Sequence, residues 1–335
     1  MTHSKRKSDV SEYTLDEVEL PNEKRSKVEL NTNDLLLLND AHCIETDYQT
    51  VFETIADKLI NSYELVLNAK HIFRLSEIEF YFYHQTRHPD TFAHRHPEQQ
   101  RYSNWYFHRQ GTSSTASYKA GTYKGVDITF GSSNDSSYGG ILIRSIENKQ
   151  TGQIYEGSCL VVDAILNLCD CKAIKELVET KLNKNLRVFN EKSTMYLRSI
   201  QTATAAIQKI LASPRVGLTL KVPSVDRERF LFRSYRFTPQ NYYPSKMKMM
   251  IVLVLAGEKY FHDKQGTLTS HANYLSDKTN SRLSTVKSNL NDLQNGYDTD
   301  TSKKSSPLVD YYKKNLSASD LARAYGIWLR QYRST

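Results

Sequence analysis

The sequence has few cysteines and no long hydrophobic run, and both absences narrow what the protein can be. Its 335 residues include four cysteines and no Cys-x-x-Cys pair, which excludes a disulfide-stapled scaffold and favours a reducing intracellular compartment. The longest apolar run, residues 249–257, is far shorter than the roughly 18 residues that a membrane-spanning helix needs. We therefore expect no signal peptide and no membrane partner, and a buried strand or short helix at this run.

Acidic residues are concentrated at one end of the chain. Residues 1–50 carry six Lys or Arg and eleven Asp or Glu, whereas the whole chain has 45 and 37, so the remainder has a net charge of +13. A body this basic is typical of a protein that binds a polyanion, most often nucleic acid; a solvated basic surface is the alternative. Basic clusters at residues 5–7 and 24–27 are of the kind that act as nuclear-import signals. We expect the nucleus, or otherwise the cytoplasm.

The apolar pattern divides the chain into a folded region and polar segments. Residues 1–48 predict a disordered tail, 49–260 the folded domain, 261–306 a polar linker and 307–335 a C-terminal helix that begins near Ser319. The elements interleave without a regular βαβ rhythm, which favours an α+β fold. The expected helices cover residues 51–60, 160–179 and 193–211, the expected strands cover 72–84, 125–131, 139–147, 216–222 and 229–237, and loops fill 84–124.

The most informative of these segments is the strand at residues 72–84. With a period of two, Ile78, Phe80 and Phe82 point to one face, and they can pack into a core. The opposite face carries Glu77, Glu79, Tyr81 and Tyr83. A core excludes such carboxylates unless they line a site or reach solvent. A carboxylate flanked by aromatic rings can hold a flat ring and activate a water molecule beside it.

Several segments, in their order and spacing, resemble the alkyladenine (3-methyladenine) DNA glycosylase family. They are SEIEFY at 76–81, FAHR at 92–95, GGILIRSIE at 139–147, SPRVGL at 213–218 and RFLFRSYRF at 229–237. The resemblance covers about residues 55–240. It implies a curved, mainly antiparallel sheet with surrounding helices, similar to that of the formyltransferase C-terminal domain. It also implies a monomer that repairs double-stranded DNA by base excision.

The resemblance assigns roles to individual residues. Glu79 matches the family's catalytic glutamate and Arg144 the arginine near the attacking water. Tyr81 and His94 match the base pocket, and Phe130 matches the aromatic wedge that enters the minor groove. Asp127 or Val126 stands where the family has a second stacking tyrosine, and FGS replaces the family's tyrosine-glycine-methionine signature. The stretch before His94 is also longer than in the family, so that His88 or His96 can take its place.

The chemistry of such a site is consistent with these residue types. Cleavage of a base–sugar bond passes through an oxocarbenium-like state, which a carboxylate stabilises while it takes a proton from water, and a nearby Arg144 favours the ionised form. The enzyme must also flip its base, at a cost of a few kcal/mol. No lysine is placed for Schiff-base chemistry, so we expect a single-function glycosylase without a metal or cofactor. The expected phosphate-binding residues are Arg101, Arg109, Lys119, Lys124, Arg233 and Arg236.

Three alternatives remain open from the sequence. A buried ion pair between Arg144 and Glu79, together with a core position for Phe130, would explain these residues without catalysis. The family's fold could persist as an inactive nucleic-acid-binding module, as the missing second stacking tyrosine suggests. Finally, the histidines between His84 and His108 have spacings that can bind a metal, which would suit a metal-dependent nuclease.

Overall fold

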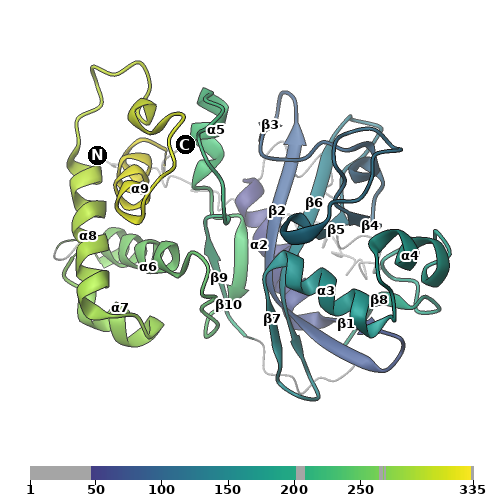
Figure 1. Cartoon of the computed structure of the whole chain (residues 1–335). Coiled ribbons are helices and arrows are strands. Elements are labelled where there is room, and N and C mark those ends of the chain that lie inside the picture. Colours follow the sequence, from purple (N-terminus) through teal and green to yellow (C-terminus); the bar gives the residue numbers. More distant parts are fainter. Residues whose placement is uncertain (1–46, 201–207, 264–266, 268, 333–335) are drawn as a thin grey trace, which may run out of the picture.

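The structure is a curled antiparallel sheet with a unit of helices beside it (Figure 1). It is a computed structural model that describes residues 47–200, 208–263, 267 and 269–332. The expectation of an α+β fold with a curved, mainly antiparallel sheet is confirmed, since the sheet forms about half of a barrel. Almost all of the predicted tail at 1–48 lies outside the described residues.

Strand β2 (His71–His84) is the centre of the sheet because it pairs with four other strands. A register shift between Leu75 and Ile78 marks a β-bulge, which bends the strand. The path through the sheet is β4 (Trp105–Phe107), β5 (Val126–Thr129), β6 (Tyr138–Asn148), β2, β1 (Tyr63–Leu67) and β8 (Met195–Ser199). Three short strands extend it: β3 (His88–Pro89) and β10 (Arg236–Pro239) on β2, and β7 (Ile154–Glu156) on β6, while β9 (Ile210–Ser213) pairs with β10.

The main core lies on one face of this sheet. Ile78, Phe80 and Phe82 are at most 3% exposed, as the alternation of the strand predicts. Helix α2 (Tyr48–Ser62) packs into the same hydrophobic cluster and begins at Asp47, whose side chain accepts a hydrogen bond from the backbone N–H of Gln49. Helix α3 (Ser158–Leu168) also packs there, followed by the short helix α4 (Ile174–Glu176) and a π-helical turn at Leu177–Lys181.

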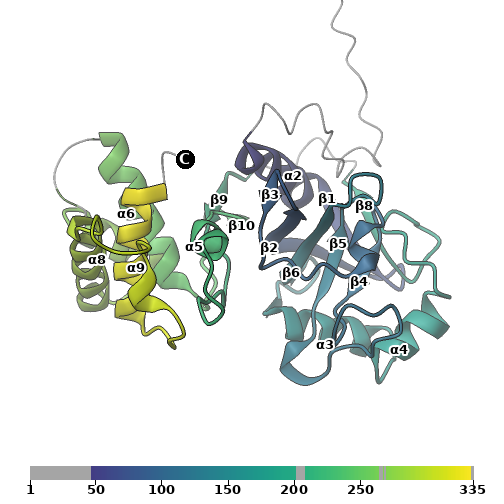
Figure 2. The same ribbon diagram turned by 90° about the horizontal axis from the view of Figure 1, so that it is seen from above.

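The helical unit has a hydrophobic cluster of its own and is joined to the sheet through β9, β10 and α5 (Figure 2). Its glycines allow close packing, since a Cβ on Gly326 of α9 would lie 2.2 Å from the carbonyl oxygen of Leu293 in α8. The unit contains α5 (Val225–Leu231), α6 (Lys248–Asp263), α7 (Ala272–Thr279), α8 (Leu283–Asp298) and α9 (Ala318–Tyr332).

The prediction of a polar linker at 261–306 is wrong, because α7 and α8 occupy most of it. The polar composition of this segment masks a few apolar residues at helical spacing. Val286, Leu290 and Leu293 of α8 are at most 1% exposed in the second cluster. The C-terminal helix is confirmed as α9, and the apolar run at 249–257 lies in α6.

Four other predicted elements differ from the structure. In place of a helix at 193–211 the chain forms β8 and β9, because Met195 and Leu197 alternate into the core while β8 pairs with β1. No strand forms at 216–222, and the predicted strand at 229–237 is the end of α5 followed by β10. The predicted helix at 160–179 is interrupted between α3 and α4.

Candidate active site

The face of the sheet opposite the core brings the predicted site residues together. Glu79 of β2 lies opposite Leu142 of β6, Leu142 opposite Asp127 of β5, and Asp127 opposite Tyr106 of β4. Directly opposed residues share a face, so these side chains and those two positions along each strand form one polar surface. Gly140 in β6 is needed there, because a Cβ at this position would lie 2.5 Å from an oxygen of Asp127.

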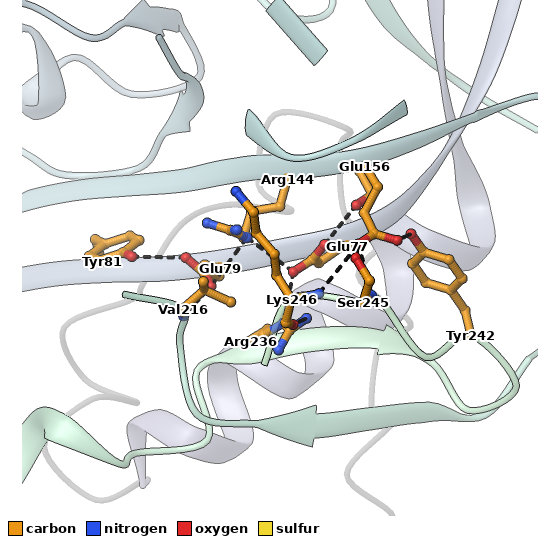
Figure 3. Close-up of polar contacts among 11 residues, drawn as sticks. Glu77, Glu79, Tyr81, Arg144, Glu156, Val216, Arg236, Tyr242, Ser245 and Lys246 are labelled. Atoms are coloured by element: carbon orange, nitrogen blue, oxygen red, sulfur yellow. Dashed lines mark hydrogen bonds and ion pairs between the residues drawn. The ribbon is translucent and has the colours of Figure 1, made fainter. Parts of the chain in front are cut away.

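Glu79 is fully buried and held by two hydrogen-bond donors and one cation (Figure 3). The hydroxyl of Tyr81 donates to Oε2 at 2.8 Å, and the backbone N–H of Val216 donates to Oε1 at 2.6 Å. Nε of Arg144 lies 3.5 Å from the same Oε1. Burial, and next the negative charge of Glu79, raise the pKa of Tyr81 well above its usual value, which keeps the hydroxyl a donor. The carboxylate is therefore fixed by β2, by β6 and by the segment after β9.

Glu77, two residues earlier on β2, is paired more tightly. It accepts from Nε of Arg144 at 3.0 Å, from Nε of Arg236 at 2.8 Å and from the hydroxyl of Ser145 at 2.6 Å. Arg144 is thus shared between two carboxylates and lies closer to Glu77. Burial lowers the pKa of Arg144, but the charges of Glu79 and Glu77 raise it to a net value above the usual one. Glu77 ties β2, β6 and β10 together (Figure 3).

A second buried ion pair beside Glu79 was not predicted from the sequence. Nη1 of Arg215 lies 2.6 Å from Oδ2 of Asp90, and both side chains are fully buried. The guanidinium of Arg215 also lies 4.6 Å from the centre of the Tyr81 ring, so it occupies one face of that ring. Arg215 belongs to the SPRVGL segment, where an arginine between apolar residues indicates a buried cation that needs an acidic partner.

Asp127 lies two strand spacings from Glu79, roughly 10 Å away, in a cluster of rings and amides, and His94 joins this cluster through Tyr106 of β4. Nδ1 of His94 is 2.7 Å from the hydroxyl of Tyr106. Burial, and then the charges of Lys119 and His108, lower the pKa of His94 to about 4, so its imidazole is neutral near pH 7. Asp127 is 2% exposed, lies 2.8 Å from Nε2 of His108 and accepts from Gln99 at 3.2 Å. Tyr106 and Gln99 were not singled out from the sequence, and His108 was named there only among the histidines with metal-binding spacings.

Phe130 is a core residue in this structure, so its prediction as a DNA wedge is wrong. It is 3% exposed, and its ring centre lies 5.6 Å from that of Phe82 and 5.8 Å from that of Phe80. The reason is that the alternation of β5 continues past its end: Val126 and Ile128 point into the core, and Phe130 follows them at the same period.

The six predicted phosphate-binding cations are in different environments. Arg236 is fully buried against Glu77, so its prediction is wrong. Arg233 is half-buried, 6.0 Å from the Trp328 ring centre. Arg109 pairs with Glu98 and Lys124 with Asp163. Arg101 and Lys119 have no carboxylate within 4 Å among the described residues.

The histidines do not converge on a metal site within the described part of the chain, where no group of three or more His, Cys, Asp or Glu side chains could hold an ion. They face different partners. His88 is buried between the carbonyl of Phe82 and the hydroxyl of Tyr235, whereas Nδ1 of His84 accepts from backbone N–H groups of the adjacent turn. His96 caps the 3₁₀ turn at Pro97–Gln100.

No helix among the described residues combines the length and apolar character needed to cross a membrane. No family model matches the sequence. A curated protein of Acanthamoeba polyphaga mimivirus, "Uncharacterized protein L759", is 35% identical to this chain over 198 residues. The alignment covers 56% of this chain and 86% of the viral protein.

Proposed function

This chain belongs to the same family as the mimivirus protein. From the geometry around Glu79 we propose that it is a nucleic-acid-binding N-glycosylase. The proposal is that it flips a damaged or modified purine and hydrolyses the base–sugar bond. The observation that carries it is the Glu79 carboxylate, which Arg144, Tyr81 and Val216 hold in one orientation on a polar sheet face. The basic body of the chain supports the polyanionic substrate.

In the proposed reaction the oxygen of a water molecule bonds to the anomeric carbon as the carbon–nitrogen bond breaks, and the electron pair of that bond leaves with the base. Glu79 takes a proton from the water and stabilises the positive charge of the transition state. Tyr81 and Arg144 fix the carboxylate so that no reorganisation is needed during the reaction. Asp127 and neutral His94, across the same face, would read the edge of the flipped base.

A second candidate is a nucleic-acid-binding module without catalysis, and one observation favours it. Glu79 is 0% exposed, and the segment that carries Val216 covers it, so water reaches the carboxylate only if this segment moves. In the module, Glu79 would be a structural partner of Arg144, and the buried position of Phe130 would leave base flipping without its wedge.

The experiment that separates the two is base release from single-stranded and duplex DNA that contains alkylated adenine or hypoxanthine. We expect the parent protein to release the base and Glu79→Gln to lose activity by about 10² to 10⁴-fold, the size of a general-base contribution. The matched control is Glu64→Gln, because Glu64 on β1 is nearly as buried, at 6% exposed, and pairs with two other cations, Lys149 and Arg198.

Release that persists in Glu64→Gln and disappears in Glu79→Gln would assign the activity to Glu79, provided that both variants bind DNA and unfold like the parent. Equal DNA binding by all three proteins, with no release from any of these substrates, would favour the binding module.

A further inference from the structure

A basic groove lies along the β4 edge of the sheet, away from the Glu79 side chain. Its larger hollow, of about 860 Å³, lies between the loop at 109–124 and the segment at 172–186 that follows α3. A second hollow of about 780 Å³ shares Arg101 with the first. The groove is outside β2, since three strand spacings, roughly 14 Å, separate β2 from β4.

The two hollows lie on opposite sides of one extended segment, which is hydrogen-bonded to the chain at the start of β4. The backbone N–H of Trp105 donates to the carbonyl of Leu186 at 2.7 Å, and the N–H of Val188 donates to the carbonyl of Ser103 at 3.1 Å. Because side chains alternate along an extended segment, Leu186 lines the first hollow and Arg187 the second, while Lys184 lines the first hollow from the preceding turn. The two hollows therefore flank this segment and share Arg101, and together they make up the groove.

The groove carries an excess of unneutralised positive charge. Seven Lys or Arg side chains and two Glu side chains line the first hollow, and the second is lined by two Arg and no acidic residue. Of the seven, Arg109 pairs with Glu98, and Lys124 pairs with Asp163. No carboxylate of the described residues lies within 4 Å of the other five, which are Arg101, Lys119, Lys172, Lys175 and Lys184.

Aromatic rings accompany these cations. Tyr118 lines the first hollow, Tyr102 and Phe189 line the second, and all three are partly exposed. A positively charged groove with aromatic rings along it is the usual arrangement for single strands, whose phosphates meet the cations while the bases stack on the rings. A duplex has its bases already stacked and cannot use such rings.

We infer that this groove binds single-stranded nucleic acid, with phosphates on Lys172, Lys175 and Lys184 and bases stacked on Tyr102 and Phe189. The inference deepens the proposed function, on which it rests for the class of polymer, and it replaces double-stranded DNA as the expected partner. Lys119 connects the groove to the Glu79 face, since its backbone N–H donates to the carbonyl of His108, whose side chain contacts Asp127.

The test is binding of a fluorescent single-stranded oligonucleotide, and of its duplex, over a series of salt concentrations. The groove variant combines Lys172→Glu, Lys175→Glu and Lys184→Glu. Its matched control combines Lys287→Glu, Lys303→Glu and Lys314→Glu, which make the same charge change at exposed positions of the helical unit. Full-length protein is used throughout, and thermal unfolding checks that each variant is folded.

We expect the groove variant to lose at least about tenfold in single-strand affinity, and the slope of log affinity against log salt to fall by about 2, or about 0.7 for each lost phosphate contact. The control should bind like the parent. Phe189→Leu should lower single-strand affinity by about fivefold or more and leave duplex affinity unchanged, because only unpaired bases stack on it.

Equal binding by parent and groove variant, or tighter binding of the duplex by the parent, would overturn the inference. Base release separates this failure from that of the proposed function. Loss of release in Glu79→Gln with normal binding by the groove variant would contradict the groove alone. Loss of binding in the groove variant, with no release by the parent, would support the groove and contradict the glycosylase.

Discussion

The Glu79 face and the basic groove lie in the same sheet domain, yet they differ in whether their charged side chains are paired. Around Glu79, each buried carboxylate has a guanidinium partner. In the first hollow of the groove, five cations have no carboxylate of the described residues within 4 Å. Burial of a charge without a partner costs several kcal/mol of desolvation, whereas an exposed charge remains hydrated and can bind a ligand. The face balances the carboxylates of Glu77, Glu79 and Asp90 with the guanidinium groups of Arg144, Arg215 and Arg236.

Residue type alone does not decide whether a cation stabilises the fold or binds a ligand. Arg236 and Arg101 were both predicted to bind phosphates. Arg236 is 0% exposed and supports the fold through Glu77, whereas Arg101 is exposed where the two hollows meet. Substitutions on the face should therefore change stability strongly, and substitutions in the groove should change binding with little effect on stability.

The largest effect on stability is expected from Glu77→Leu. The substitution leaves Arg144 and Arg236 buried without their shared carboxylate, so the free energy of unfolding should fall by about 3–5 kcal/mol. The matched control is Glu64→Leu, whose cationic partners Lys149 and Arg198 are each 37% exposed and can turn to water. It should cost only about 1 kcal/mol. Equal losses in urea denaturation would contradict the difference between buried and exposed partners.

A smaller loss is expected from Gly140→Ala. The new methyl group would lie 2.5 Å from Asp127 and 2.7 Å from the amide of Gln99, which are paired and buried. Displacement of this pair should cost about 1–3 kcal/mol. In contrast, Gly257 lies inside α6, and a methyl group there would be 3.6 Å from its nearest neighbour, a side-chain carbon of Leu329. Because alanine is favoured over glycine in a helix, Gly257→Ala should stabilise the protein by about 0.5–1 kcal/mol. An unchanged midpoint of thermal unfolding for Gly140→Ala would show that the face is less tightly packed than described.

Stability should depend on pH through His88, a buried residue whose two ring nitrogens both have hydrogen-bond partners. Burial lowers its pKa from 6.5 to about 4, although Asp90 acts in the opposite direction. Between these two values the unfolded chain holds a proton that the folded protein lacks, so stability falls as the pH falls through this window and is unaffected above it. The loss is roughly 1.4 kcal/mol per pH unit. Its removal in His88→Gln should lower the slope of the stability curve between pH 4 and 6.5 by this amount and leave the similar contribution of His94, and an unchanged curve would contradict the account.

The smallest effect on stability is expected in the groove. Lys175→Ala removes an exposed, unpaired cation and should change the free energy of unfolding by less than about 0.5 kcal/mol. Its effect should instead be a salt slope for single-strand binding that is lower by about 0.7. Destabilisation by more than 1 kcal/mol would indicate a structural role for this lysine.

Local patterns predicted the parts of the fold in which one strand face is apolar throughout. The alternation in β2 predicted both of its faces, and the apolar run of β6 predicted a strand next to it. The segment at 261–306 was predicted wrongly because its composition is polar, and only the contacts of a few apolar residues decide its structure. The helix at 193–211 was predicted wrongly because the pairing of β8 with the distant strand β1 decides the structure there.

The site was predicted less completely, for a physical reason. Glu79 and Tyr81 carry their signal in the alternation of one strand, the resemblance to the glycosylase family added Arg144, and the structure places the three together. Arg215 and Asp90 are 125 positions apart, and only the folded chain brings them together. Phe130 was predicted from its place in the resemblance as a DNA wedge, but the alternation that it shares with Val126 and Ile128 places its side chain in the core.

The most direct test of the division between face and groove is single-turnover base release measured over a range of protein concentrations. The parent, Glu79→Gln and the triple groove variant are compared on one lesion-containing single strand. The account predicts that the groove variant reaches the parent's maximal rate only at higher concentration, and that Glu79→Gln has a maximal rate at least about a hundredfold lower. Base release by Glu79→Gln at the parent's rate would contradict it.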